Sequence, residues 1–92
     1  MKVLYSPESI EDLKLLREFI DVKNPKAAQR IALSILKGIS QLKKFPLLGV
    51  EVDKAPDSEM VRDLILGNYI IRYFVGSEIN ILRVWHHKEN RL

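Results

Sequence analysis

The sequence contains no cysteine, and this absence excludes two kinds of structure. Without thiols the chain has no disulfide framework and no thiolate metal site, which is typical of proteins in a reducing compartment. No apolar run approaches the roughly 20 residues that span a bilayer, and the first two residues lead straight into a short apolar stretch without a signal sequence. We therefore expect a cytoplasmic protein that does not contact a membrane.

Motifs of familiar catalytic chemistry are also missing. There is no glycine-rich phosphate loop, no nucleophile elbow and no His/Asp/Glu cluster at metal-ligand spacing. Adjacent strand residues point to opposite faces, so His86 and His87 are not expected to chelate one ion. One imidazole could act as a general acid or base, but two amphipathic rings at a strand end are the simpler interpretation. We predict no metal and no cofactor.

Length and charge set further bounds. The chain has 92 residues, which predicts a single domain over residues 1–92 with modest stability. A net charge of +3 and a pI near 9.3 make it mildly basic. This charge permits binding to nucleic acid or to an acidic peptide without demonstrating either.

The last third of the chain predicts a β-hairpin. Tyr69–Val75 and residues 78–86 are rich in β-branched and aromatic side chains, as in strands. Gly76 and Ser77 between them suit a two-residue type II′ turn, which needs a positive φ at its first position. In that register Val75 pairs with Glu78, and the pairing assigns every side chain to a face.

The two predicted faces differ in character. The core-facing set, interrupted by Asn80, comprises Tyr69, Ile71, Tyr73, Val75, Leu82 and Val84. The opposite set comprises Ile70, Arg72, Phe74, Ile79, Ile81, Arg83 and Trp85. Because bulky apolar groups accompany two arginines there, we interpret the second face as a surface that a partner occupies.

The first half of the chain predicts two antiparallel helices after a short strand at residues 2–5. Ser6-Pro7 and Asn24-Pro25 are cap-plus-proline start signals, and Pro46 ends the second helix near residue 45. The first apolar stripe is Ile10, Leu13, Leu16 and Ile20, with Asp12 among the solvated residues. The second is Ala28, Ile31, Ile35, Ile39 and Leu42, widened by Leu33 and Leu36. Residues 47–59 show no period and predict a loop that is either functional or mobile.

These elements predict an α+β fold of order β-α-α-β-β-β, with a mostly antiparallel sheet and a helical hairpin on one face. Within it, Arg62, Arg72 and Arg83 form the best candidate functional cluster. They are explained equally well as structural partners for carboxylates such as Asp63 and Glu78.

The series of motifs resembles the RelE/ParE superfamily of small bacterial toxins. The segments that carry the resemblance are SPES-EDL (6–13), NPKAA (24–28), L-KKFP-LG (42–49), VRDL (61–64), NYIIRY (68–73) and INILRVWHHKENR (79–91). The resemblance implies the toxin of a type II toxin–antitoxin pair, held inactive by a cognate antitoxin in a hetero-oligomer. An antitoxin segment, which tends to be amphipathic and acidic, would suit the face with apolar groups and arginines.

Two branches of the superfamily differ in activity. RelE-like members cleave messenger RNA on the ribosome, and ParE-like members poison DNA gyrase. RelE-like enzymes usually carry an arginine directly after the central-strand tyrosine, where this chain has Ile70, and a lysine pair in the preceding strand, where it has only Arg62. RelE-like enzymes also carry a late tyrosine, which this chain lacks, whereas Arg83 and the histidine that follows the strand, in RVWHH, resemble the ParE-like pattern. The ParE-like branch is therefore favoured.

The resemblance yields specific expectations. A ParE-like toxin has no catalytic residues and contacts gyrase, here through residues 83–91. The alternative, an mRNA endonuclease, would use Arg62, Arg72, Arg83 and His87, and an inactive family member would only bind its antitoxin. The predicted partner-binding residues are Arg72, Phe74, Ile81, Arg83, Trp85, His87, Lys88 and Arg91.

Overall fold

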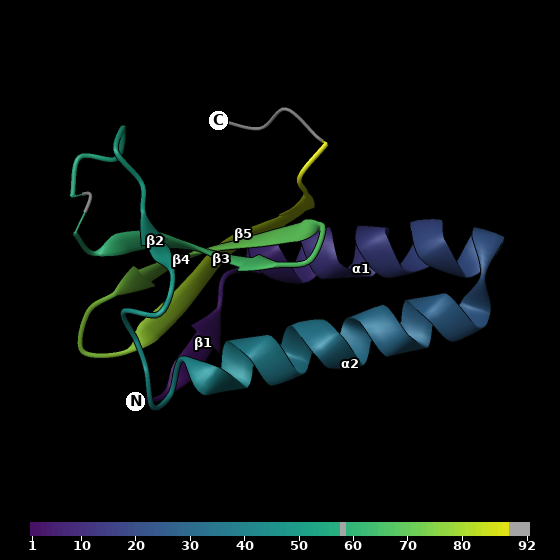
Figure 1. Ribbon diagram of the computed structural model, residues 1–92, viewed down its shortest axis with the longest axis horizontal. Coiled ribbons are helices and arrows are strands. Elements are labelled where there is room, and N and C mark those ends of the chain that lie inside the picture. The colour runs from purple at the N-terminus through teal and green to yellow at the C-terminus, as the bar shows by residue number, and fades with distance from the viewer. Residues whose placement is uncertain (58, 89–92) are drawn as a thin grey trace.

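A five-stranded mixed sheet and a helical hairpin make up the fold (Figure 1). The computed structural model describes residues 1–57 and 59–88. The elements in chain order are β1 (Val3–Tyr5), α1 (Pro7–Lys23), α2 (Pro25–Gln41), β2 (Val50–Glu51), β3 (Val61–Leu66), β4 (Tyr69–Val75) and β5 (Ile79–His86). The strand order is β1-β5-β4-β3-β2, in which β1 runs parallel to β5 and the other pairs are antiparallel.

The predicted α+β class and element order are confirmed, with one strand added. The sequence prediction missed β2 because two residues are too few to display a period. Both residues of β2 are exposed, and they pair with Asp63 and Arg62 of β3. In the part of the chain that the structure describes, no helix is long and apolar enough to cross a membrane.

The helix starts follow the predicted capping chemistry. Ser6 accepts a hydrogen bond from the amide of Ser9 at 3.0 Å, and Pro7 occupies the first helical position. Asn24 ends α1 through its own amide, which donates to the Ile20 carbonyl, and begins α2 through its side chain, which accepts from Ala27. α2 ends at Gln41, four residues before the predicted end, because residues 42–44 continue as turns.

The core lies between one face of the sheet and the helical hairpin. The stripe predicted for α2 is confirmed, since Ala28, Ile35, Ile39 and Leu42 are buried and Ile31 packs against the cluster. Leu33 and Leu36, predicted to widen this stripe, are instead exposed. In α1, Leu13 and Leu16 pack against the core, but Ile10 is about half exposed.

The predicted register of the β4–β5 hairpin is wrong for the residues of β5 nearest the turn, 79–82. Val75 pairs with Ile79, so the connection has three residues, and Ile79 and Ile81 are completely buried. Leu82, predicted to face the core, is only half buried. A one-residue slip exchanges the two faces of a strand, which is the error made for residues 79–82.

A β-bulge at Leu82 restores the predicted faces farther along β5. Tyr73 pairs with Ile81 and Arg72 pairs with Arg83, so Leu82 is the extra residue. Val84 is consequently buried against the helices, as predicted. The bulge also directs two successive carbonyls toward α1: the Ile81 carbonyl accepts from the Ser6 amide and the Leu82 carbonyl from the Ser6 hydroxyl.

The turn chemistry explains the register error. Gly76 does not have a positive φ, whereas Gly67, in the two-residue connection between β3 and β4, has a φ of 60°. That conformation at the first loop position is the requirement of a type II′ turn. The two-residue glycine turn therefore lies one hairpin earlier than predicted.

Candidate functional site

Arg72 lies on the sheet face away from the helices and is held by its neighbours. Its Nε and Nη2 atoms donate to the two carboxylate oxygens of Asp63 at 2.9 and 3.0 Å, across the β3–β4 pair. Its guanidinium also lies 5.1 Å from the ring centroid of Trp85. The hydrogen bond to Asp63 raises the pKa of Arg72 above its ordinary value. This bidentate pair fixes the orientation of the arginine.

Arg83 is paired with a carboxylate from α1. Its Nε and Nη2 donate to the oxygens of Asp12 at 2.8 and 2.9 Å, and one of these oxygens also accepts from the amide of Val84 at 2.9 Å. The hydrogen bond to Asp12 raises the pKa of Arg83. Asp12, predicted to be solvated, is only 5% exposed, because its carboxylate satisfies the β5 backbone where β1 no longer pairs with it.

Arg62 holds the segment that follows α2. Its Nη1 donates to the carbonyls of Leu47 and Gly49 at 3.2 and 2.9 Å, and its Nε donates to the Glu59 carbonyl at 3.0 Å. An ion pair of 3.6 Å joins it to Glu51. Its side chain is therefore engaged with the backbone of its own chain.

The two histidines lie together at the end of β5, contrary to the prediction that they point apart. Their ring centroids are 5.0 Å apart in a stacked arrangement, because the strand ends at His86. His86 also contacts Tyr69 edge-on, and its Nδ1 accepts from the Lys88 amide at 3.2 Å. The His87 amide donates to the Asn68 carbonyl at 2.7 Å. Among residues 1–57 and 59–88, no group of three His, Cys, Asp or Glu residues is placed to hold a metal ion.

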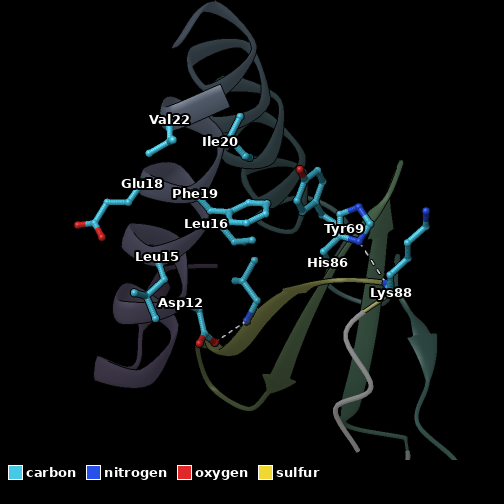
Figure 2. Close-up of a pocket in the computed structure, with 11 residues that line it drawn as sticks. Asp12, Leu15, Leu16, Glu18, Phe19, Ile20, Val22, Tyr69, His86 and Lys88 are labelled. Carbon is cyan, nitrogen blue, oxygen red and sulfur yellow. Dashed lines mark hydrogen bonds between the residues drawn. The ribbon is translucent and has the colours of Figure 1, made fainter. Parts of the chain in front are cut away.

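An open groove of about 880 Å³ separates α1 from the ends of β4 and β5. Its lining residues are Asp12, Leu15, Leu16, Glu18, Phe19, Ile20, Val22, Tyr69, Val84, His86 and Lys88. Figure 2 shows Leu16 and Phe19 directed from α1 toward Tyr69 and His86. Figure 1 shows that both helices extend past the end of the sheet toward their connection. The groove is a mostly apolar surface, with Lys88 on its sheet side and the carboxylates of Asp12 and Glu18 on its α1 side.

Sequence reasoning missed the α1 wall of this groove. Leu15, Phe19 and Val22 are each more than half exposed, and their spacing of four and three residues is helical. They form a second apolar stripe on α1, beside the stripe that packs against the core. This second stripe was the available sequence signal.

The predicted partner-binding residues do not form one surface. Ile81 is completely buried in the core, so that assignment is wrong. Trp85 is 4% exposed beneath Arg72, and Phe74 is half buried. Lys88 is exposed and lines the groove. Arg91 lies outside the described residues.

The strand, the helical hairpin and the mixed sheet place this chain in the class of small α+β proteins. The family described as "ParE toxin of type II toxin-antitoxin system, parDE" matches residues 3–91. A curated relative, "Toxin RelE2" of Caulobacter vibrioides, is 30% identical over 86 residues, covering 92% of this chain and 93% of that protein.

The fold has a counterpart among solved structures. The "Chromosomal ParDE TA system from P. aeruginosa" includes a chain that superimposes with a TM-score of 0.78 at 23% identity, covering 94% of this chain and 95% of that one. At this identity the likeness concerns the fold. Together with the family match, it confirms the superfamily that the sequence motifs indicated. The chain belongs to the ParE toxin family of type II toxin–antitoxin systems.

Proposed function

We propose that this toxin acts in the ParE-like manner, by binding DNA gyrase and trapping its DNA-cleaved state. The observation that carries the proposal is the engagement of the three arginines that RNA cleavage would need. Arg72 is paired with Asp63, Arg83 with Asp12, and Arg62 with backbone carbonyls. A phosphate transition state requires cations directed at one reacting centre, and these three are directed at partners in their own chain.

The positions of Arg62 and His87 also weigh against the endonuclease alternative. His87, one of the four residues of the endonuclease set, stacks on His86 and contacts Asn68 in the β3–β4 turn. Arg62 lies near the other end of β3 and is directed toward the segment that follows α2. Arg62 and His87 therefore lie toward opposite ends of β3, which weighs against their acting on one RNA phosphate.

Antitoxin binding is proposed to occur in the groove beside α1. Leu15, Phe19 and Val22 offer exposed apolar surface at helical spacing, and Lys88 adds a positive charge on the opposite wall. An amphipathic, acidic segment of an antitoxin is complementary to both features. Within the gyrase contact expected at residues 83–91, the described residues Val84, His86 and Lys88 line this groove, so an antitoxin bound there would cover part of that contact.

The activity is tested with purified gyrase, supercoiled DNA and increasing toxin. We expect linear or nicked DNA to accumulate and supercoiling to fall. Unaffected gyrase together with persistent growth arrest in cells would contradict the proposal and favour cleavage of translated mRNA. The groove is tested by Phe19→Glu, which should abolish antitoxin binding, with Leu33→Glu on α2 as a control of similar exposure. Equal antitoxin affinity of the two variants would exclude the groove.

A further inference from the structure

The segment that follows α2 exposes apolar side chains that the core does not use. Phe45, Leu47, Leu48 and Val50 are 61%, 56%, 47% and 56% exposed. We name residues 45–50 the apolar loop. Isolated exposed apolar residues are ordinary, but four within six positions concentrate exposed apolar surface in one short segment, as at protein interfaces.

The backbone of the apolar loop is held by buried and charged groups. The hydroxyl of Tyr73 donates to the Pro46 carbonyl and accepts from the Gly49 amide, both at 2.8 Å, and Tyr73 itself is completely buried. Arg62 donates to the carbonyls of Leu47 and Gly49. The side chains therefore reach solvent from a backbone that these bonds hold in place.

Gly49 allows the apolar loop to lie close against the sheet. A Cβ atom at this position would lie 2.8 Å from the Tyr73 ring and 2.9 Å from the Asp63 carbonyl oxygen. Only glycine allows the loop backbone to approach the sheet this closely. A surface that is ordered before binding loses little entropy when a partner arrives, so it suits recognition.

The charge around the apolar loop specifies the chemistry of its partner. Lys43 and Lys44 precede it and are exposed, residues 42–50 contain no carboxylate side chain, and Glu51, which follows, is ion-paired with Arg62 at 3.6 Å. The complementary surface is apolar and acidic. Exposed aliphatic groups favour a protein over a nucleic acid, whose recognition relies on arginine and lysine contacts to phosphate.

We propose that the apolar loop is a second binding surface for the antitoxin, separate from the groove. This inference rests on the proposed docking of an antitoxin segment in the groove, and it does not depend on the identity of the toxin's target. The groove borders Tyr69, at the first residue of β4, whereas the apolar loop bonds to Tyr73, four residues along that strand. An extended segment of about ten residues spans roughly 30 Å, which is ample for this separation. Two linked contacts would give the tight neutralisation that neither gives alone.

The test compares two double variants of matched exposure. Leu47→Ser with Leu48→Ser removes apolar surface from the loop, and Leu33→Ser with Leu36→Ser removes it from α2, where the two leucines are 61% and 50% exposed. The probe is the protein encoded next to the toxin gene, titrated by calorimetry against each purified, folded toxin. We expect the loop variant to bind at least about tenfold more weakly and the α2 variant to bind like the wild type.

Growth arrest in cells without the antitoxin gives the second readout. The loop variant should arrest growth as the wild type does, because the proposed surface serves neutralisation. Unchanged antitoxin affinity in the loop variant would overturn the inference. Loss of growth arrest with intact antitoxin binding would also overturn it, since the loop would then belong to the target surface. The gyrase proposal fails separately, through the action of the wild-type toxin on purified gyrase.

Discussion

Arg72 and Arg83 lie directly opposite one another across β4 and β5, yet each is neutralised by a carboxylate from a different element. Asp63 of β3 pairs with the first, and Asp12 of α1 pairs with the second. Like charges facing each other destabilise a strand pair, and these two ion pairs remove that repulsion. The two arginines therefore tie the central strands to β3 on one side and to α1 on the other.

The pair between Arg83 and Asp12 should contribute measurably to stability. Arg83→Leu takes the guanidinium away from a carboxylate that is 4% exposed, and we expect a loss of about 2–3 kcal/mol in the free energy of unfolding. A double-mutant cycle with Asp12→Asn, followed by urea unfolding, should give a coupling energy above about 1 kcal/mol. A coupling near zero would show that the two side chains act independently.

The register of β5 predicts a difference between neighbouring positions. Ile81→Asp places a charge in the core, which costs several kcal/mol and should prevent folding of a domain this small. Leu82→Asp places it at a half-buried bulge, and this variant should remain folded with a loss of about 1–2 kcal/mol. Circular dichroism and urea unfolding separate the two outcomes. A folded Ile81→Asp protein would contradict the register.

Tyr73 should make stability fall at alkaline pH. Burial raises the pKa of its hydroxyl above the ordinary value near 10. The folded state therefore holds this proton more tightly than the unfolded state, and the stabilisation is complete below pH 10 and is lost as pH rises through the folded pKa. Tyr73→Phe should lack this part of the pH dependence. It should also lose about 1–2 kcal/mol at neutral pH, because Gly49 and Pro46 lose a hydrogen-bond partner.

The control for this measurement is Tyr5→Phe. Burial also raises the pKa of Tyr5, so this variant should lose only its own share of the alkaline slope and keep that of Tyr73. Identical pH profiles for the wild type and Tyr73→Phe would show that the Tyr73 hydroxyl is not linked to folding.

Gly67 should tolerate asparagine better than alanine. Its φ of 60° places it in the left-handed region, where a Cβ costs roughly 1–2 kcal/mol unless the side chain bonds locally. No heavy atom would contact an added Cβ, so the conformation alone determines the effect. We expect Gly67→Ala to lower the melting temperature by about 4–8 °C and Gly67→Asn by less. Equal melting temperatures would indicate that the turn relaxes.

Structural features that depend only on neighbouring residues could be predicted from the sequence. Ser6-Pro7 and Asn24-Pro25 located the starts of both helices, and the spacing of Ala28, Ile35 and Ile39 identified the buried face of α2. Capping and helical periodicity are local effects, so they depend little on the rest of the fold.

Features that depend on residues distant in the sequence could not be predicted in this way. The burial of Asp12 requires the β5 edge, 71 residues away, to present an arginine and an amide. The bulge at Leu82 lies where β5 pairs with β4 on one side and the Leu82 carbonyl accepts from Ser6, 76 residues earlier in the chain, on the other. The α1 side of the candidate groove could have been predicted from the helical spacing of Leu15, Phe19 and Val22. Its sheet side could not, because it depends on tertiary structure.

Asn24 forms the entire connection between the two helices. This short connection limits where residues can be inserted or deleted during evolution. A single inserted residue in the second half of α1 would turn the direction in which α2 departs by about 100°, since each residue advances a helix by that angle. The buried face of α2 would then no longer meet the sheet. We expect insertions and deletions among relatives to avoid this joint and to gather in residues 52–60.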